Sequence, residues 1–244
     1  MELGFRIRSI IGIMLPVKRG FVKSPDATAE PSPGPERQLR ADARRNRERV
    51  LAAAEQVFAD SGLKGQIDEV ARRAGVGVGT VCRNFPTKQA LVEAVLTSMY
   101  ESLVNQALAA LEHPDPGVAF EQFFVALPEF QARHRALGEQ MANELELPSS
   151  AQPLREQLTA ALTELVTRAQ ASGAIRADIG PADVAMLFAG IAHATAIAGE
   201  LQPVLRERYV RIVLDGMRPG DASRLPGRPL DFAQLRRMKQ RRKP

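Results

Sequence analysis

The sequence predicts an all-α chain of two domains. Apolar residues recur at helical spacing in one segment after another between residues 41 and 217. Strand-like alternation occurs only in fragments, and no repeat of fixed period is present. Near the N-terminal end, two short segments with apolar faces are separated by a glycine turn, QIDEVARRAGVGVGTVCRNFPTK. We therefore expect a small helical domain over residues 41–96 and a larger helical domain over residues 97–219.

Composition and charge narrow the class of protein. With 244 residues, 45% of them hydrophobic and 25% charged, the chain has the make-up of ordinary globular domains. Its single cysteine excludes an internal disulfide and a cysteine-based zinc site, which fits a reducing, cytoplasmic setting. Residues 37–96 carry 11 Lys/Arg against 7 Asp/Glu, whereas residues 97–219 carry 9 against 15. The N-terminal domain is therefore the part expected to meet an anionic partner.

Residues 1–40 are expected to form a disordered N-terminal extension. An apolar and basic start is followed by a linker, SPDATAEPSPGPERQLR, that is rich in Pro, Ser and charge. The apolar run at 10–15 is shorter than a signal-peptide core or a membrane span, and Gly12 and Pro16 would interrupt an amphipathic membrane helix. No membrane partner is expected, and a translation start at Met14 stays open.

The first long helix is expected over residues 41–61, with one apolar face and with Gly62 as its stop. Positive charge near a helix start opposes the helix dipole, so bound phosphate would offset the cost of the basic residues there. A solvated charged face is the alternative. The basic residues in question are Arg44, Arg45, Arg47 and Arg49.

Two short helices and a tight turn are predicted within residues 66–88. The first helix has the i, i+3, i+4, i+7 apolar spacing, and Gly75 can adopt the left-handed conformation that closes it. The second helix starts near Val78 and ends before Pro86. Its hydroxyl, amide and guanidinium groups suit the base edges of a DNA major groove. The side chains expected to face outward on it are Val78, Thr80, Cys82, Arg83 and Asn84.

Two other interpretations of this stretch are weaker. A dinucleotide-binding loop needs glycine at position 80, where Thr80 stands, and no strand pattern precedes the glycines. A helical hairpin without DNA contacts would leave the polar display on the second helix unexplained.

The motif AGVGVGTVCRNFPTK, preceded by ARRNRERVLAAAEQVFADSG and followed by KQALVEAVLTSMY, resembles the DNA-binding domain of the TetR/AcrR family of bacterial regulators over residues 41–96. The chain departs from the family pattern at four positions. Gln66 replaces a capping Thr or Ser, Gly77 an N-cap Ser, Cys82 a phosphate-contacting Tyr, and Asn84 a His. The residues expected to contact DNA are Arg44, Arg45, Gln66, Val78, Thr80, Cys82, Arg83, Asn84 and Lys88.

Six further helices are expected after the helix-turn-helix. A long helix from Lys88 to about Leu111 precedes a Phe-rich helix that is kinked or broken at Pro128 and followed by a shorter one. A helix capped by Ser149 or Ser150 is followed by one starting at Pro181 and by a last one ending near residue 216. Residues 220–244 are expected to form a basic, flexible tail that adds non-specific phosphate contacts at most.

A small-molecule site is expected between the Phe-rich helix and two later helices, because aromatic and apolar walls with few polar groups are typical of such pockets. Ordinary core packing of the phenylalanines is the alternative, and His193 could equally be a core or interface histidine. The residues expected to line the site are Phe120, Phe123, Phe124, Met141, Leu158, Leu162 and His193.

A dimer interface is expected over residues 181–217. The helix at 183–199 carries almost no charge after its first residue, and a helix that is apolar all round must be buried on all sides. The family resemblance implies that the last two long helices form a four-helix bundle with those of a second subunit. The residues expected at this interface are Leu187, Phe188, Ile191, Thr195, Tyr209, Ile212 and Val213.

No catalytic constellation stands out, and the three histidines lack the spacing that a metal on one helix needs. We therefore expect no enzyme activity, no cofactor and no metal. The resemblance implies a homodimeric repressor that binds a near-palindromic double-stranded operator and releases it when a small, mainly apolar molecule binds. The alternatives are a ligand-independent DNA-binding protein of architectural type and a helical enzyme or carrier that has lost DNA binding.

Overall fold

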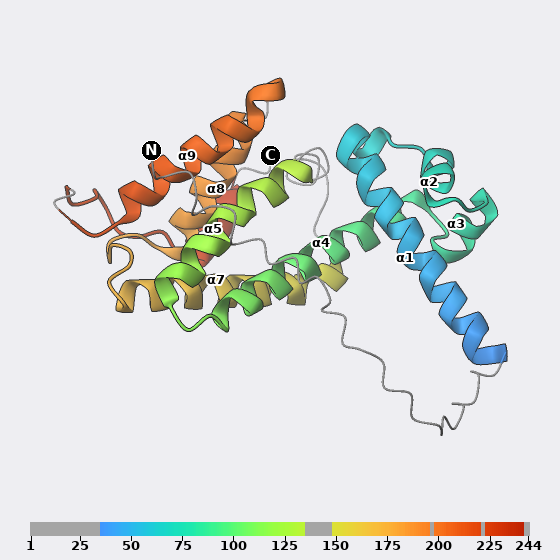
Figure 1. Ribbon diagram of the computed structural model, residues 1–244, viewed down its shortest axis with the longest axis horizontal. Helices are drawn as coiled ribbons and strands as arrows, with labels where there is room; N and C mark the ends of the chain where they lie inside the picture. Colours follow the sequence, from blue (N-terminus) through green and yellow to red (C-terminus); the bar gives the residue numbers. More distant parts are fainter. Residues whose placement is uncertain (1–34, 135–147, 196–197, 221–222, 242–244) are drawn as a thin grey trace, which may run out of the picture. The chain divides into compact units, whose positions relative to one another are not determined.

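The computed structural model describes residues 35–134, 148–195, 198–220 and 223–241. These residues form helices joined by turns, with no strand among them, which confirms the all-α prediction (Figure 1). None of the helices in these ranges is both long and apolar enough to cross a membrane. Of the expected N-terminal extension, residues 1–34 lie outside the described part of the chain. Its last residues are helical, because α1 spans Pro35–Ser61.

The earlier start of α1 changes the interpretation of its arginines. Residues 44–49 lie in the middle of the helix and not in its first turns. The helix dipole acts mainly within the first and last turns, so it imposes little cost on positive charge at these positions. Bound phosphate is therefore not needed to explain why the arginines are there.

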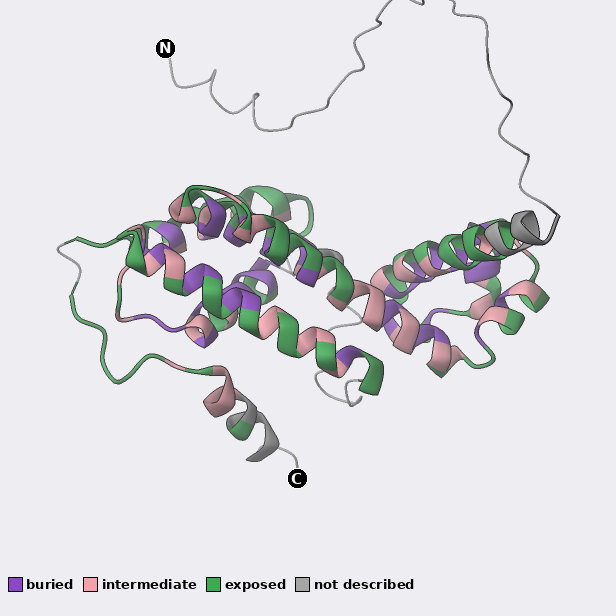
Figure 2. Ribbon diagram, turned by 90° about the horizontal axis from the view of Figure 1, so that it is seen from below, coloured by how far each residue is buried: buried purple, intermediate pink, exposed green. Residues whose placement is uncertain are grey.

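Four helices of the N-terminal domain enclose one core. Along the chain, α1 is followed by α2 (Ile67–Ala74), α3 (Val78–Asn84) and α4 (Lys88–Leu111), of which the first half belongs to this domain. The inward faces of these helices are fully buried, and their outward faces are exposed (Figure 2). The buried side chains at the centre of this core include Val50, Phe58, Val70, Val81 and Leu91.

The C-terminal domain is built on the second half of α4. Its other main helices are α5 (Pro116–Arg133), α7 (Gln152–Ala171), α8 (Pro181–Thr195) and α9 (Gln202–Met217). Because α4 contributes buried residues to this core as well as to the N-terminal core, one continuous helix belongs to both.

Two helix boundaries differ from expectation. α5 runs through Pro128 to Arg133 and is not broken there; the shorter helix expected after it lies outside the described residues. α7 has Ala151 at its N-cap, because Ser149 and Ser150 belong to a 3₁₀ turn ahead of it. The Ser150 hydroxyl instead lies 2.9 Å from that of Thr97 on α4.

The C-terminal segment differs most from expectation. Residues 223–232, here called the C-terminal strap, are held against the domain and lead into α10 (Phe232–Arg241). The carboxylate of Asp178 accepts the Leu225 N–H at 3.1 Å, and that of Asp183 accepts the Leu230 N–H at 3.1 Å. The expectation of a loose tail is therefore corrected for this stretch. The physical reason is that two acceptors some 45 residues earlier satisfy backbone donors of the strap.

Candidate nucleic-acid interface

The turn between α2 and α3 is built as the sequence predicts. Gly75 adopts the left-handed conformation with φ 64° and ψ 38°, and its N–H donates to the carbonyl of Arg72 at 3.2 Å. The Val76 N–H returns to the carbonyl of Ala71 at 3.1 Å, so the last carbonyls of α2 are satisfied. Gly77 has an extended backbone conformation, and α3 starts at the next residue. This turn sets the angle between the two short helices.

Packing determines which face of α3 is available. Val81 and Phe85 are buried in the N-terminal core and hold the helix by its inner side. On the outer side, Cys82 and Arg83 are exposed, together with Val78, whose exposed fraction is 42%. Thr80 and Asn84 are half-buried. Val78, Cys82 and Arg83 therefore face outward as the sequence predicted, whereas Thr80 and Asn84 are only partly exposed.

Arg83 differs from the arginines around it. Among the residues that the structure describes, it has no hydrogen-bond or ion-pair partner, and it carries a planar, five-donor group on the exposed face of α3. Such a group can bind guanine O6 and N7, or a phosphate, with two parallel hydrogen bonds.

The arginines of α1 are engaged within the chain. Arg44 pairs with Glu48 at 3.5 Å, and Arg45 pairs with Asp42. These exposed pairs are weak and leave both arginines able to exchange partners. Arg44 and Arg45 thus lie on an exposed face, and their contact with DNA stays a prediction.

Two other arginines of α1 hold the helix-turn-helix in place, a role that sequence reasoning missed. Arg49 Nη2 donates to the carbonyl of Ala74 at 2.5 Å and to that of Gly75 at 3.1 Å. The guanidinium carbon of Arg47 lies 4.7 Å from the centre of the Phe85 ring. Nothing local in the sequence indicates these contacts, because their partners lie 25 to 38 residues further along the chain.

Ion pairs link residues within α2, and one of them joins α2 to the end of α1. Glu69 accepts hydrogen bonds from Arg72 and Arg73, which lowers the pKa of its carboxyl group, the bond from Arg72 having the larger effect. Arg73 reaches Asp60 at 2.8 Å. The two arginines of α2 are therefore positioned by neighbouring acids.

At two of the positions that depart from the family pattern, the side chain is hydrogen-bonded within the chain. Gln66 occupies the N-cap of α2 without a side-chain cap, and its amide donates to the carbonyl of Lys64 at 3.1 Å. The Asn84 amide donates to the carbonyl of Thr80 at 2.9 Å and is partly committed to its own helix. Lys88 is half-buried at the first position of α4, where the Thr87 side chain accepts the Ala90 N–H at 3.0 Å.

The predicted ligand residues lie mainly in the core. The rings of Phe124 and Phe188 pack with centroids 3.9 Å apart, and Phe120 and Phe124 with centroids 5.7 Å apart. Phe123, Leu158 and Leu162 belong to the same cluster, in agreement with the alternative of ordinary core packing. His193 is exposed on α8, and Met141 lies outside the described residues.

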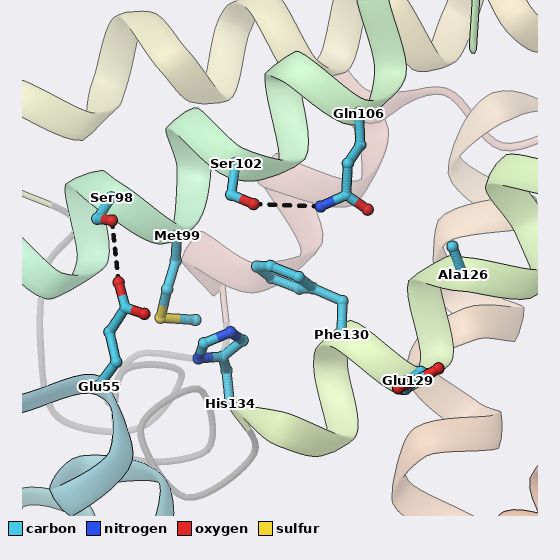
Figure 3. A pocket seen from close by; sticks show the side chains of 9 residues that line it. All are labelled: Glu55, Ser98, Met99, Ser102, Gln106, Ala126, Glu129, Phe130 and His134. Carbon is cyan, nitrogen blue, oxygen red and sulfur yellow. Dashed lines mark hydrogen bonds between the residues drawn. The ribbon is translucent and has the colours of Figure 1, made fainter. Parts of the chain in front are cut away.

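A hollow of about 360 Å³ lies elsewhere, between α1, α4 and the end of α5 (Figure 3). None of the described residues expected to bind a ligand lines it. Ser98 donates to Glu55 Oε1 at 2.9 Å on one side of it, and Gln106 donates to the Ser102 hydroxyl at 3.2 Å on another. The lining residues are Glu55, Ser98, Met99, Ser102, Gln106, Ala126, Glu129, Phe130 and His134.

The predicted interface residues fall on two faces. Phe188, Ile191 and Thr195 are buried against their own chain, so they are unavailable to a partner and the expectation for them is corrected. The physical reason is that the Phe-rich face of α5 already covers this side of α8. Tyr209 and Val213 are half-buried, whereas Leu187 and Ile212 are exposed. The exposed large apolar residues of α8 and α9, here together called the α8/α9 face, are Met186, Leu187, Val204 and Ile212.

Two family models match the chain. The model described as bacterial regulatory proteins, tetR family, matches residues 50–95. The model described as transcriptional regulator SbtR-like, C-terminal domain, matches residues 115–219. The helix-turn-helix and the helical C-terminal domain are thus each matched separately.

Similar proteins include regulators of known name. The HTH-type transcriptional regulator UidR of Escherichia coli K12 is 24% identical over 179 residues, which cover 69% of this chain and 89% of UidR. The HTH-type transcriptional repressor BepR of Brucella suis is 34% identical over 100 residues, covering 39% of this chain and 47% of BepR.

Solved structures agree with the fold. The TetR transcriptional regulator SCO0520 of Streptomyces coelicolor is 33% identical with a TM-score of 0.60, covering 71% of this chain and 98% of that one. A TetR transcription regulatory protein of Mycobacterium vanbaalenii is 38% identical with a TM-score of 0.60, covering 74% of this chain and 99% of that one. The likeness therefore extends over nearly the whole length of these relatives.

Proposed function

Because this chain belongs to the TetR family of bacterial transcriptional regulators, we propose that it is a sequence-specific repressor that releases its operator when a small molecule binds the C-terminal domain. DNA binding and the regulation of transcription follow from the family. Repression is supported by the similarity to a named repressor over part of the chain. It acts as a cytoplasmic homodimer that uses no cofactor.

The observation that carries the proposal is the exposure of Arg83 and its lack of a partner among the described residues. It lies on the exposed face of α3 without a partner among the described residues, while the other arginines of the domain discussed above are paired or packed. A bidentate contact from Arg83 to guanine would supply about 1 to 3 kcal/mol of discrimination against other bases. Thr80 and Val78 stand beside it for further contacts to base edges.

The homodimer is supported by the α8/α9 face. Val204 and Ile212 on α9 are 65% and 55% exposed, and Met186 on α8 is 49% exposed, so both helices carry large apolar side chains on the surface of one chain. Exposed apolar side chains on neighbouring helices favour an interface there. A twofold dimer presents two α3 helices to half-sites about 34 to 36 Å apart, and it therefore selects a near-palindrome.

Release requires that the effector prefer a form of the dimer that does not fit the operator. A tenfold loss of operator affinity corresponds to about 1.4 kcal/mol of such preference. Because two adjacent major-groove faces must be met at once, a change of a few Å in the spacing of the α3 helices is sufficient.

The first experiment is to select bound sequences from a random DNA pool with the full chain, and then to measure affinity for the selected operator. A near-palindrome is expected. An architectural protein would enrich no defined sequence and would bind all duplexes alike.

The second measurement uses Arg83→Ala, with Arg218→Ala as a matched control on an exposed arginine that pairs with Asp215 at the end of α9. We expect at least a tenfold loss of operator affinity for Arg83→Ala and none for the control, with both melting temperatures near that of the parent protein. Normal operator binding by Arg83→Ala would contradict the assignment of this residue.

A further inference from the structure

Val78 is an apolar side chain on the outer side of the helix that is proposed to contact DNA. Its exposed fraction is 42%, and among residues 42–96 it is the only large apolar residue that is exposed. It is the first residue of α3, whose inner side is held in the N-terminal core by the buried Val81 and Phe85. The attachment of α3 to its own domain therefore does not account for an apolar residue at position 78.

The positions on either side of Val78 leave it accessible. Gly77 and Gly79 are both exposed, and a Cβ at either one would meet no atom within 4 Å, so open space lies next to the helix there. Cys82, one helical turn further along the same edge of α3, is exposed as well, and a free cysteine behaves as a small apolar residue. This edge of α3 thus presents apolar groups to any molecule that approaches it.

We propose that Val78 contacts the methyl group of a thymine in each half-site of the operator and so determines part of the sequence preference. The inference rests on the proposed function, since it names a base pair that the DNA-binding site selects. The C5-methyl group of thymine is the apolar group among the base edges of the major groove, where the other groups are hydrogen-bond donors and acceptors. Residues near the N-terminus of a recognition helix are the ones that contact base edges, and Val78 holds the first position.

Arg83 gives the spacing of the two contacts. It follows Val78 by five positions, which at a rise of about 1.5 Å per residue places the two residues about 7.5 Å apart along α3. Base pairs are about 3.4 Å apart along DNA, so this distance corresponds to about two base pairs. The thymine contacted by Val78 and the guanine proposed for Arg83 are therefore expected on different base pairs of one half-site.

A protein partner fits this edge less well. A stable protein interface buries about 800 Å² on each partner. One exposed valine between two glycines supplies little of such a surface, whereas a single methyl group on a base is matched by a single apolar side chain.

The test uses the operator selected by the full chain, with its thymines replaced one at a time by deoxyuridine. Uracil keeps every hydrogen-bonding group of thymine and lacks only the methyl group, so the replacement removes the proposed contact alone. We expect one position in each half-site at which the replacement weakens binding about fourfold, which corresponds to about 0.8 kcal/mol for one methyl-sized group. The absence of such a position, or selected half-sites without thymine, would overturn the proposal.

A matched pair of variants assigns the effect to Val78. Val78→Ala shortens an exposed side chain, so the fold should be kept, and the uracil replacement should then weaken binding less than twofold because the methyl group has already lost its partner. Val118→Ala makes the same change at an exposed valine of α5 and should keep the full effect. An equal effect of uracil in Val78→Ala and in the parent chain would overturn the role of Val78, because the methyl group would then act through another residue or through the shape of the DNA.

The selection experiment separates this proposal from the one it rests on. A chain that enriches no defined sequence would overturn the proposed function and the thymine contact with it. A chain that enriches a defined operator, but binds it equally well after every uracil replacement, would overturn the role of Val78 and leave the proposed function standing.

Discussion

At the scale of single residues, the interface depends on which arginines are already engaged. Arg49 and Arg47 are used to position the helix-turn-helix, and Arg72 and Arg73 are held by acids. Arg83 is left for an external partner. The contacts of these arginines thus divide them into residues that support the helix-turn-helix and one, Arg83, that is proposed to contact DNA.

The first prediction at this scale concerns Arg49→Ala. Hydrogen bonds from a charged donor are worth about 1.5 to 3 kcal/mol, so losing the bonds to the carbonyls of Ala74 and Gly75 should lower the free energy of unfolding by about that amount. Arg45→Ala, which removes only an exposed pair with Asp42, should cost less than about 1 kcal/mol. Urea unfolding measures both; equal losses in the two variants would contradict the anchoring role of Arg49.

The helix-turn-helix was predictable nearly to the residue because its signals are local. The apolar spacing of α2, the left-handed Gly75 and the stop before Pro86 all act within a few positions of one another. The role of Arg49 was not predictable, because the carbonyls it binds are brought to it only by tertiary packing.

At the scale of elements, α8 also shows that contacts made by tertiary packing cannot be predicted from a local pattern. The sequence predicts an apolar helix, but it does not say which apolar side chains the chain covers by itself. Phe188 is inside because Phe124 meets it, whereas Leu187, the preceding residue, is exposed. The C-terminal strap was missed for a related reason, since Asp178 and Asp183 fix it from a distance in sequence.

Gly180→Ala should dislodge the C-terminal strap. A Cβ at Gly180 would collide with the backbone carbonyl oxygen of Leu230, which cannot move without displacing the strap. Limited trypsin digestion should then cleave after Arg224 at least several times faster than in the parent chain. Gly190→Ala is the matched control, because a Cβ there meets nothing within 4 Å; equal cleavage rates in all three proteins would show that the strap does not depend on this contact.

The attachment of the strap should also depend on pH. The Arg176 guanidinium, followed by the Leu225 N–H, holds the pKa of the Asp178 carboxyl well below its usual range. A depressed folded pKa means that the stabilisation is fully present above the unfolded pKa of about 3.9 and is lost as the pH falls below it. Asp178→Asn should therefore lower the free energy of unfolding near neutral pH, and the difference from the parent chain should shrink on acidification. Urea unfolding over a pH series measures it, and a difference that does not change with pH would contradict the prediction.

At the scale of the whole molecule, dimer formation would decide whether two α3 helices bind DNA together. The α8/α9 face is apolar and exposed in one chain, and a second copy is the proposed cover. Without it, each α3 would meet its half-site independently, and the affinity gained by joining two weak contacts would be lost.

Ile212→Asp tests this assembly. Ile212 is exposed in the single chain, so the change should leave the monomer folded while placing a charge in the proposed interface. Sedimentation velocity should then show a species of 26.6 kDa in place of a dimer, with at least a tenfold loss of operator affinity. Val125→Asp places the same charge on an exposed site of α5 and should leave the dimer intact; a dimer that survives Ile212→Asp would move the interface elsewhere.

The membership of α4 in both cores has a mechanical consequence. At a rise of about 1.5 Å per residue, its 24 residues form a rod about 36 Å long. A tilt of about 5° about one end of such a rod carries the other end through about 3 Å, roughly the length of a hydrogen bond. The proposed release would then need only a small tilt of α4 about its C-terminal end to move a side chain near its first residues out of reach of a base edge.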